Sequence, residues 1–349
     1  MLQINFSHIK NYNSSFDVNI FLYEFKTLLE SGLSIIEVIQ TLLDRGEVYT
    51  AVLSPIYQDL KAGFSFSQSL THQPEIFPKL LIATVKSTEQ TGQLSLGLER
   101  YLTYMENINV LKNKITSASI YPLTVLVIGF VIFTFLLLYL IPKFSLIYND
   151  LDLNLPFLSN LLIKLGSFIY QYKIYTIITF IILLGTILYF RKNIIKNSIT
   201  YFLKFKRISY YYNAIVLTRF YRALSLMLDG GYPLISALDT CKETLNEDFK
   251  HRIESINQGL KQGEVFSLLL EQHQLTTPIA SRLIKSGEKN GNISRMLAKT
   301  ADFHDLEVSR FVDKLSKVIE PVLMIAIGGF VGMIVILLYL PIFDMVGSL

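Results

Sequence analysis

Cysteine and charge are both scarce in this sequence. Cys241 is the one cysteine among 349 residues. A single cysteine excludes an intramolecular disulfide and a multi-cysteine zinc site, and we predict a buried thiol. Charged residues make up 17% of the chain, whereas about 25% is usual in soluble proteins. The shortage of charge favours a membrane protein.

Motifs for catalysis and cofactor binding are missing as well. The chain has no Gly-x-x-x-x-Gly-Lys-Ser/Thr phosphate-binding loop, so we do not expect it to be an ATPase. His304 and Glu307, three residues apart on a predicted helix, lack further ligands nearby, and we interpret them as a solvated helical face. We therefore predict no catalytic residues, no metal, no cofactor and no enzymatic activity.

Three long hydrophobic runs stand out. Residues 122–141 and 321–340 contain no charged residue, and a third run covers 174–190. A helix of about 20 residues matches the ~30 Å hydrocarbon core of a bilayer. We predict transmembrane helices at 122–141, 174–190 and 320–340. The spans lack the buried ionisable groups that a transporter would use. Glu320 and Asp344 stand at opposite ends of the third span, which disfavours an aspartyl peptidase with paired carboxylates.

Basic residues indicate the orientation. Residues 191–207 contain six Lys or Arg, whereas 142–173 contain Lys143, Lys164 and Lys173. Basic segments beside spans are usually cytoplasmic. We predict cytosolic domains at 1–121 and 191–319, an extracytoplasmic loop at 142–173 and an extracytoplasmic tail at 341–349. No signal-peptide core is expected in residues 1–19. Lipid headgroups account for the basic cluster, so direct nucleic acid binding is not expected.

Much of the chain is written twice, which predicts two similar domains. Lys-Ser-x-Glu-x-x-Gly occurs at 86–92 and again at 285–291, an offset of 199 residues. The same offset relates several other residues, and an offset of 200 relates Pro78 to Pro278. The pairs at 199 are Phe21 and Phe220, Gly32 and Gly231, Gly92 and Gly291, Pro122 and Pro321, and Pro142 and Pro341.

Both cytosolic portions are predicted to be bundles of short helices, so the fold class is an all-α polytopic membrane protein. Apolar residues recur at helical spacing, as at Phe220, Leu224 and Leu228. Glycines mark the turns, and we expect structural turns at Gly32, Gly92, Gly231 and Gly291.

Glu89 and Glu288 within the repeated motif have two interpretations. Glu288 is expected near the start of the helix that follows Gly291, where a negative charge is favourable. The motif is then a structural turn. Alternatively, Glu89 and Glu288 contact a partner that engages both domains.

The membrane segments carry further candidate sites. Gly328 and Gly332 form a Gly-x-x-x-Gly pair, which lets another helix approach closely. That helix belongs either to the same chain or to a second copy. Four prolines mark the predicted membrane boundaries: Pro122, Pro142, Pro321 and Pro341.

These features resemble the platform proteins of type IV pilus and type II secretion machines, the PilC/GspF family, over nearly the whole chain. Thr88 departs from the pattern, because the family usually has glycine there. The short N-terminus and the Ile, Asn, Lys and Tyr content are most like the Gram-positive competence pseudopilus member, ComGB. The resemblance rests on Ser31-Gly32-Leu33-Ser34, Gly230-Gly231-Tyr232-Pro233, Gly287-Glu288-Lys289-Asn290-Gly291, Tyr121-Pro122, Ile141-Pro142-Lys143-Phe144, Glu320-Pro321 and Tyr339-Leu340-Pro341-Ile342-Phe343.

The resemblance implies a multi-pass protein of the cytoplasmic membrane that lies above a hexameric assembly ATPase. Such proteins help convert ATPase motions into extraction and polymerisation of pilin-like subunits. The implied partners are this ATPase, pilins or pseudopilins, membrane lipid and further copies of the chain. Competence DNA uptake is the expected pathway, and a type II secretion or true type IV pilus platform is the alternative.

Overall fold

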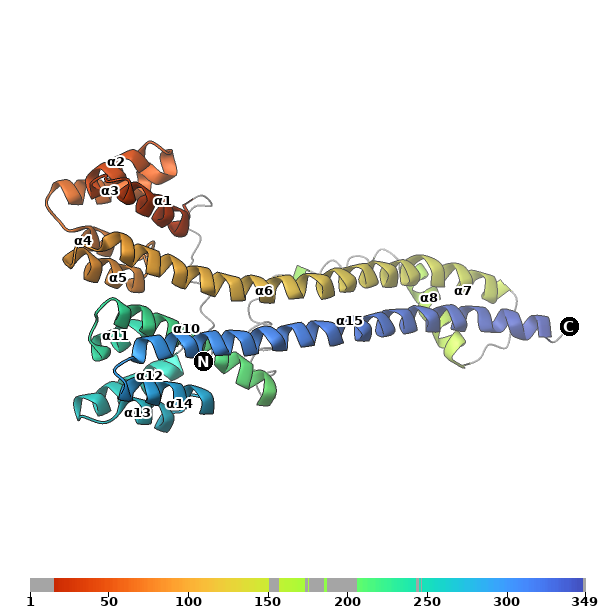
Figure 1. Cartoon of the computed structure of the whole chain (residues 1–349). Helices are drawn as coiled ribbons and strands as arrows, with labels where there is room; N and C mark the ends of the chain where they lie inside the picture. The colour runs from red at the N-terminus through yellow and green to blue at the C-terminus, as the bar shows by residue number, and fades with distance from the viewer. Residues whose placement is uncertain are drawn as a thin grey trace. The chain divides into compact units, whose positions relative to one another are not determined.

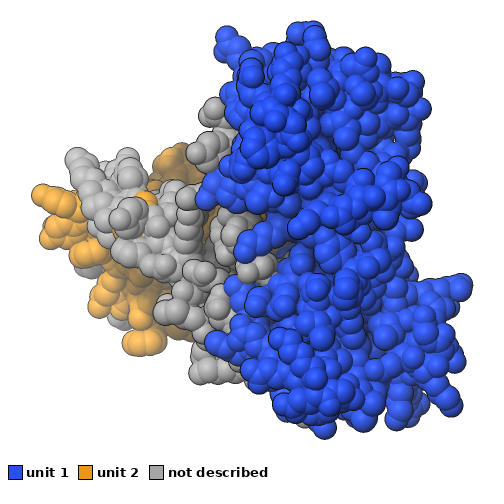
Figure 2. All heavy atoms as spheres, turned by 90° about the vertical axis from the view of Figure 1, so that its left-hand side faces the viewer, with its two compact units in different colours: residues 1–112, 200–308 blue, residues 113–199, 309–349 orange. Residues whose placement is uncertain are grey.

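The computed structural model describes residues 16–150, 157–172, 175, 185–186, 206–242, 245 and 247–347, and within these ranges every regular element is a helix. The chain divides into two compact units, shown in Figures 1 and 2. Unit 1 contains Met1–Lys112 and Thr200–Val308, and unit 2 contains Asn113–Ile199 and Ser309–Leu349.

Unit 1 holds the two repeats. The first repeat has five helices followed by the start of α6, and the second repeats that order up to the start of α15. The helices of the first repeat are α1 (Val18–Glu30), α2 (Ile35–Leu43), α3 (Glu47–Lys61), α4 (Phe66–Thr71), α5 (Lys79–Gln90) and α6 (Leu94–Phe135). Those of the second are α10 (Lys206–Asp229), α11 (Leu234–Cys241), α12 (Glu247–Lys261), α13 (Phe266–Gln272), α14 (Pro278–Lys289) and α15 (Ile293–Gly347).

The structure corrects one pair of the predicted duplication. Pro78 is the N-cap of α5, whereas Pro278 is the first residue of α14, whose N-cap is Thr277. Thr277 is therefore the equivalent of Pro78. The offset returns from 200 to 199 here because the stretch between the starts of α13 and α14 is one residue shorter than the stretch between the starts of α4 and α5.

One buried cluster includes residues from both repeats, so the repeats share a core. Phe25 stacks on Phe66 at a centroid distance of 4.7 Å in the first repeat. Phe220, Tyr221 and Phe266 are buried in the second. The all-atom view shows unit 1 as one continuous body of side chains (Figure 2).

The α6 and α15 helices continue from the repeats into unit 2. Leu94–Tyr148 and Ile293–Leu340 are each long and apolar enough to cross a membrane. Only 11% of the most apolar 18-residue window of each is buried within the chain. This exposure is unlike the core helix of a soluble protein. The predicted spans 122–141 and 320–340 both lie in these helices.

Within unit 2, α6 and α15 meet at corresponding positions of the repeats. Lys114 lies 2.8 Å from the carboxylate of Asp313, exactly one repeat offset away. Further along, a Cβ added at Gly129 would lie 2.6 Å from Ile327 Cδ1. The rings of Phe133 and Phe330 follow at a centroid distance of 5.3 Å. The two apolar helices therefore run in matched register.

The segment predicted as an extracytoplasmic loop, 142–173, contains helical structure where it is described. A π-helical turn, η2 (Leu136–Leu140), leads into α7 (Ile141–Asp150), and α8 (Phe157–Gln171) follows. The wide turn directly precedes Pro142, which has no amide hydrogen to donate and whose ring crowds the preceding turn. Ser159 Oγ donates to Leu337 O at 2.8 Å, which ties α8 to α15.

Several sequence predictions lie on residues that the structure describes only in part. The middle span, 174–190, falls almost entirely outside the described residues, which include only 175 and 185–186 of it. Pro122 and Pro321 lie inside the uninterrupted helices α6 and α15, and Pro341 also falls within α15. Their role as membrane boundaries stays a prediction.

The glutamate-capped turns as a candidate functional site

The repeated Lys-Ser-x-Glu-x-x-Gly motif forms the same turn in both repeats. Gly92 and Gly291 have φ of +70° and +66°, which favours glycine. In the second copy, Asn292 N donates to Gly287 O at 2.6 Å and Gly291 N donates to Glu288 O at 3.3 Å. The first copy has the equivalent pair of bonds, so both α5 and α14 end in a Schellman motif. Gly32 and Gly231 also have positive φ, at the ends of α1 and α10.

The two glutamates bind the start of another helix in their own repeat. Glu89 accepts hydrogen bonds from Phe66 N at 2.6 Å and Ser67 N at 3.1 Å. Glu288 makes the matching bonds. It accepts from Phe266 N at 2.8 Å and from Ser267 N at 3.0 Å. Each carboxylate thus satisfies two amides at the start of α4 or α13, which have no partner within the helix.

This placement corrects the prediction for Glu288. The carboxylate was expected near the start of the following helix, but it binds the start of α13, which precedes it in sequence. The sequence spacing could not reveal this contact, because the bonded residues are 21 and 22 positions apart. The glutamate is what remains identical in both copies because both copies need the same acceptor.

The glutamate is more important for α13 than for α4. Ser65 caps α4, since its Oγ accepts from Gln68 N at 3.2 Å. The N-cap of α13 is Val265, whose side chain makes no capping bond. Glu288 therefore supplies the side-chain acceptor that Val265 cannot. A buried amide without a partner costs about 1–3 kcal/mol.

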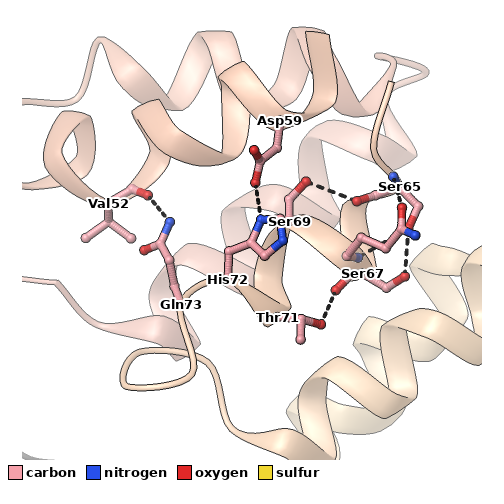
Figure 3. Close-up of polar contacts among 9 residues, drawn as sticks. Val52, Asp59, Ser65, Ser67, Ser69, Thr71, His72 and Gln73 are labelled. Carbon is pink, nitrogen blue, oxygen red and sulfur yellow. Dashed lines mark hydrogen bonds and ion pairs between the residues drawn. The ribbon is translucent and has the colours of Figure 1, made fainter. Parts of the chain in front are cut away.

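Polar contacts anchor α4 to the neighbouring helices of the first repeat (Figure 3). His72 Nδ1 lies 2.7 Å from Asp59 Oδ2 on α3, and Gln73 Nε2 donates to Val52 O at 3.0 Å. An open polar pocket of about 310 Å³ adjoins Glu89. Its lining residues are Ser65, Ser67, Gln68, Thr71, Lys86, Glu89 and Gln90.

Thr88 has a packing explanation. A Cβ added at Gly97, on α6, would lie 2.3 Å from Thr88 Oγ1. In the second repeat the sizes are exchanged, because Gly287 stands at the position of Thr88 and Met296 at the position of Gly97. A Cβ added at Gly287 would lie 2.7 Å from Met296 Cγ. Each turn has room for one side chain at this contact, so the loss of glycine at position 88 is compensated at position 97.

The serine of the first motif serves a different purpose from the glutamate, because it joins the repeats. Ser87 Oγ donates to Gly230 O, and Tyr232 OH donates to Ala83 O at 2.8 Å. Arg100 Nη1 adds a bond to Asp229 O at 2.6 Å. Sequence reasoning missed this contact, although Tyr232, where the first repeat has Leu33, signalled a polar difference between the two turns.

His304 is wrongly predicted as part of a solvated face. Its side chain is fully buried beside Tyr221, and its nitrogens lie 3.3 Å from Thr277 Oγ1 and 3.4 Å from Glu307 Oε2. Burial lowers the pKa of His304, which favours the neutral ring. Asp305, the next residue, has a pKa that burial raises. Among the described residues, no group of three potential metal ligands occurs.

The remaining candidates are placed as follows. Cys241 is buried, as predicted, and burial raises its thiol pKa. A Cβ added at Gly328 or Gly332 would meet no described atom within 4 Å, so the described part of the chain does not pack on this pair. Gly129 is the span glycine that contacts α15 closely.

Comparison with known proteins matches both repeats to one family model. The model, described as type II secretion system protein F, matches residues 21–142 and 220–341. These two matches are separated by the same offset of 199 residues as the repeats.

Relatives match nearly the whole chain. A type IV pilus assembly protein PilC of Thermus thermophilus is 30% identical, covering 95% of this chain and 83% of the relative. PilC of Pseudomonas aeruginosa is 26% identical, with coverage of 94% and 90%. A type II secretion system protein F of Xanthomonas campestris is 25% identical, with coverage of 94% and 82%.

Proposed function

The chain belongs to the type II secretion system protein F family, and we propose that it is the cytoplasmic-membrane platform of a pilus-like assembly machine. In this role it couples a hexameric cytosolic ATPase to extraction and polymerisation of pilin-like subunits. The observation that carries the proposal is the family match over both repeats, together with an apolar helix continuing from each.

The continuous helices suit mechanical coupling. α15 has 55 residues, and at 1.5 Å per residue it is about 80 Å long. It begins directly after the Gly291 turn and includes the apolar stretch. A displacement of the second repeat is therefore passed along one helix, without an intervening loop. α6 begins in the same way after Gly92.

Glu89 and Glu288 stay our candidates for the motor contact, with a more specific role. Each carboxylate is held by two amides of its own repeat. A partner would therefore meet a turn and a short helix that the glutamate holds together. The open polar pocket beside Glu89 lies next to this assembly in the first repeat.

The finer assignment follows the resemblance to the competence members. We place the protein in a pseudopilus for DNA uptake, with type II secretion or a true type IV pilus as the alternative. Further proposed partners are membrane lipid and other copies of the chain, with Gly328 and Gly332 as a packing site in the membrane. Direct nucleic acid binding is not part of the proposal.

The proposed topology has three spans, with the N-terminus in the cytoplasm and the C-terminus outside. Single cysteines introduced into a Cys241→Ser chain, labelled from outside intact cells, test it. Position 154 should label and position 197 should not. The reverse pattern would refute the topology without affecting family membership.

The motor contact is tested by co-purifying the ATPase with the detergent-extracted platform. Glu288→Gln should reduce ATPase recovery, and adding Glu89→Gln should reduce it further. Gly291→Ala is the matched control, because it strains the same turn and retains the carboxylate. If both variants lose ATPase only in proportion to their loss of thermal stability, Glu288 acts structurally and the motor contact lies elsewhere.

A further inference from the structure

The contact between the repeats uses a different face of each. The first repeat contributes α5 and the start of α6, through Ala83, Ser87 and Arg100. The second contributes the turn after α10, residues 229–232, which we call the acceptor turn. Because the repeats are duplicates, each also possesses the face that its neighbour uses.

The two unused faces can be identified from the repeat offset. The α5 face corresponds in the second repeat to Arg282, Ser286 and Lys299, which we call the donor face. All three are exposed, whereas Ala83, Ser87 and Arg100 are half-buried. The acceptor turn corresponds in the first repeat to residues 30–33. Glu30 and Ser31 there are exposed, whereas Gly230 is half-buried.

We propose that the donor face of one chain binds residues 30–33 of a second copy, repeating between chains the contact that joins the repeats within a chain. The internal contact gives the template. Ser286 would take the place of Ser87, and Ser31 that of Gly230. Lys299 replaces Arg100 and faces Glu30, which replaces Asp229.

Charge favours this partner. The donor face carries Arg282 and Lys299, and Lys285 on the same helix is also exposed. The opposing turn carries Glu30, whose side chain is 47% exposed and pairs with Lys26 in its own repeat. The basic face and the acidic turn are complementary between two copies of one sequence. Such a contact joins unlike surfaces, so it is heterologous and adds further copies in a head-to-tail manner.

Cross-linking between differently tagged chains tests the contact. One full-length chain carries Ser286→Cys, and the other carries Ser31→Cys. They are co-expressed in membranes and oxidised, with Cys241 left in place because it is buried. We expect a disulfide-linked species containing both tags. Ser87→Cys with Gly230→Cys in one chain calibrates the reaction, because that contact is present within the chain.

Ser255→Cys paired with Ser31→Cys is the matched control, because Ser255 is exposed on α12, away from the donor face. The proposal requires several-fold more mixed-tag product from position 286 than from position 255. Equal yields, with the calibration pair cross-linked, would overturn it. A product joining position 286 to the ATPase in place of a second copy would also overturn it.

A charge exchange provides an independent test. Lys299→Glu or Glu30→Lys alone should weaken association of the detergent-extracted chains about 1.5- to 5-fold, as expected for an exposed ion pair. The two substitutions combined should restore association. Lys261→Glu makes the same charge change on α12 and should have no effect. Failure of the double variant to recover refutes the Lys299–Glu30 pairing. Pilus assembly enters neither test, so the result is independent of the proposed function.

Discussion

Glu288→Gln has a defined structural consequence, because the carboxylate binds two adjacent amides. Phe266 N and Ser267 N both donate to it, at 2.8 and 3.0 Å. Glutamine has one oxygen in place of two, and its NH₂ group would face the second amide. One amide would therefore lose its acceptor. The substitution keeps the shape of the side chain but not its hydrogen bonding, so a purely structural role is sensitive to it.

The expected cost is about 1–3 kcal/mol, the range for a buried donor left without a partner. Val265 offers no replacement at the N-cap of α13. Local opening at the start of α13 should become roughly 5- to 150-fold more frequent, since 1.4 kcal/mol is tenfold in an equilibrium. Glu89→Gln should cost less, because Ser65 also caps α4.

Hydrogen–deuterium exchange of the full chain in detergent measures this opening directly. Glu288→Gln should accelerate exchange in a peptide covering residues 264–270 and leave residues 64–70 unchanged. Glu89→Gln should give the converse. Glu264→Gln is the matched control, because it neutralises an exposed carboxylate two residues before α13 begins. Unchanged exchange at residues 264–270 in Glu288→Gln would refute the capping role.

Three further outcomes are expected from thermal unfolding of the detergent-extracted chain. Gly287→Thr should destabilise it by about 1–3 kcal/mol by overpacking against Met296, and Met296→Gly should recover part of that loss; no recovery would contradict the compensated contact. Gly291→Val should cost ~1 kcal/mol or more because φ is +66°, so an unaltered melting temperature would count against the turn argument. Burial lowers the pKa of His304 below 6.5, so the unfolded chain binds more protons below about pH 6.5 and stability falls as pH falls; His304→Met should flatten this dependence, and an unchanged pH slope would exclude His304 as its source.

The sequence by itself was sufficient for the helical class, the duplication and the two described apolar helices. These are local or periodic properties. Helical spacing of apolar residues shows in a single segment, and a run such as 122–141 is apolar throughout because lipid surrounds it. The turn at Gly291 was likewise predictable, since a positive φ favours glycine.

Only the tertiary structure decided which atoms these turns serve. Glu288 acts on α13, more than twenty residues earlier, and Ser87 acts on Gly230 in the other repeat. His304 is buried although its immediate neighbours are polar. Thr88 is accommodated by a glycine nine positions away, on another helix. The physical reason is the same in each case: an unsatisfied amide or a filled space is set by segments that the folded chain brings together, and no local pattern records which segments those are.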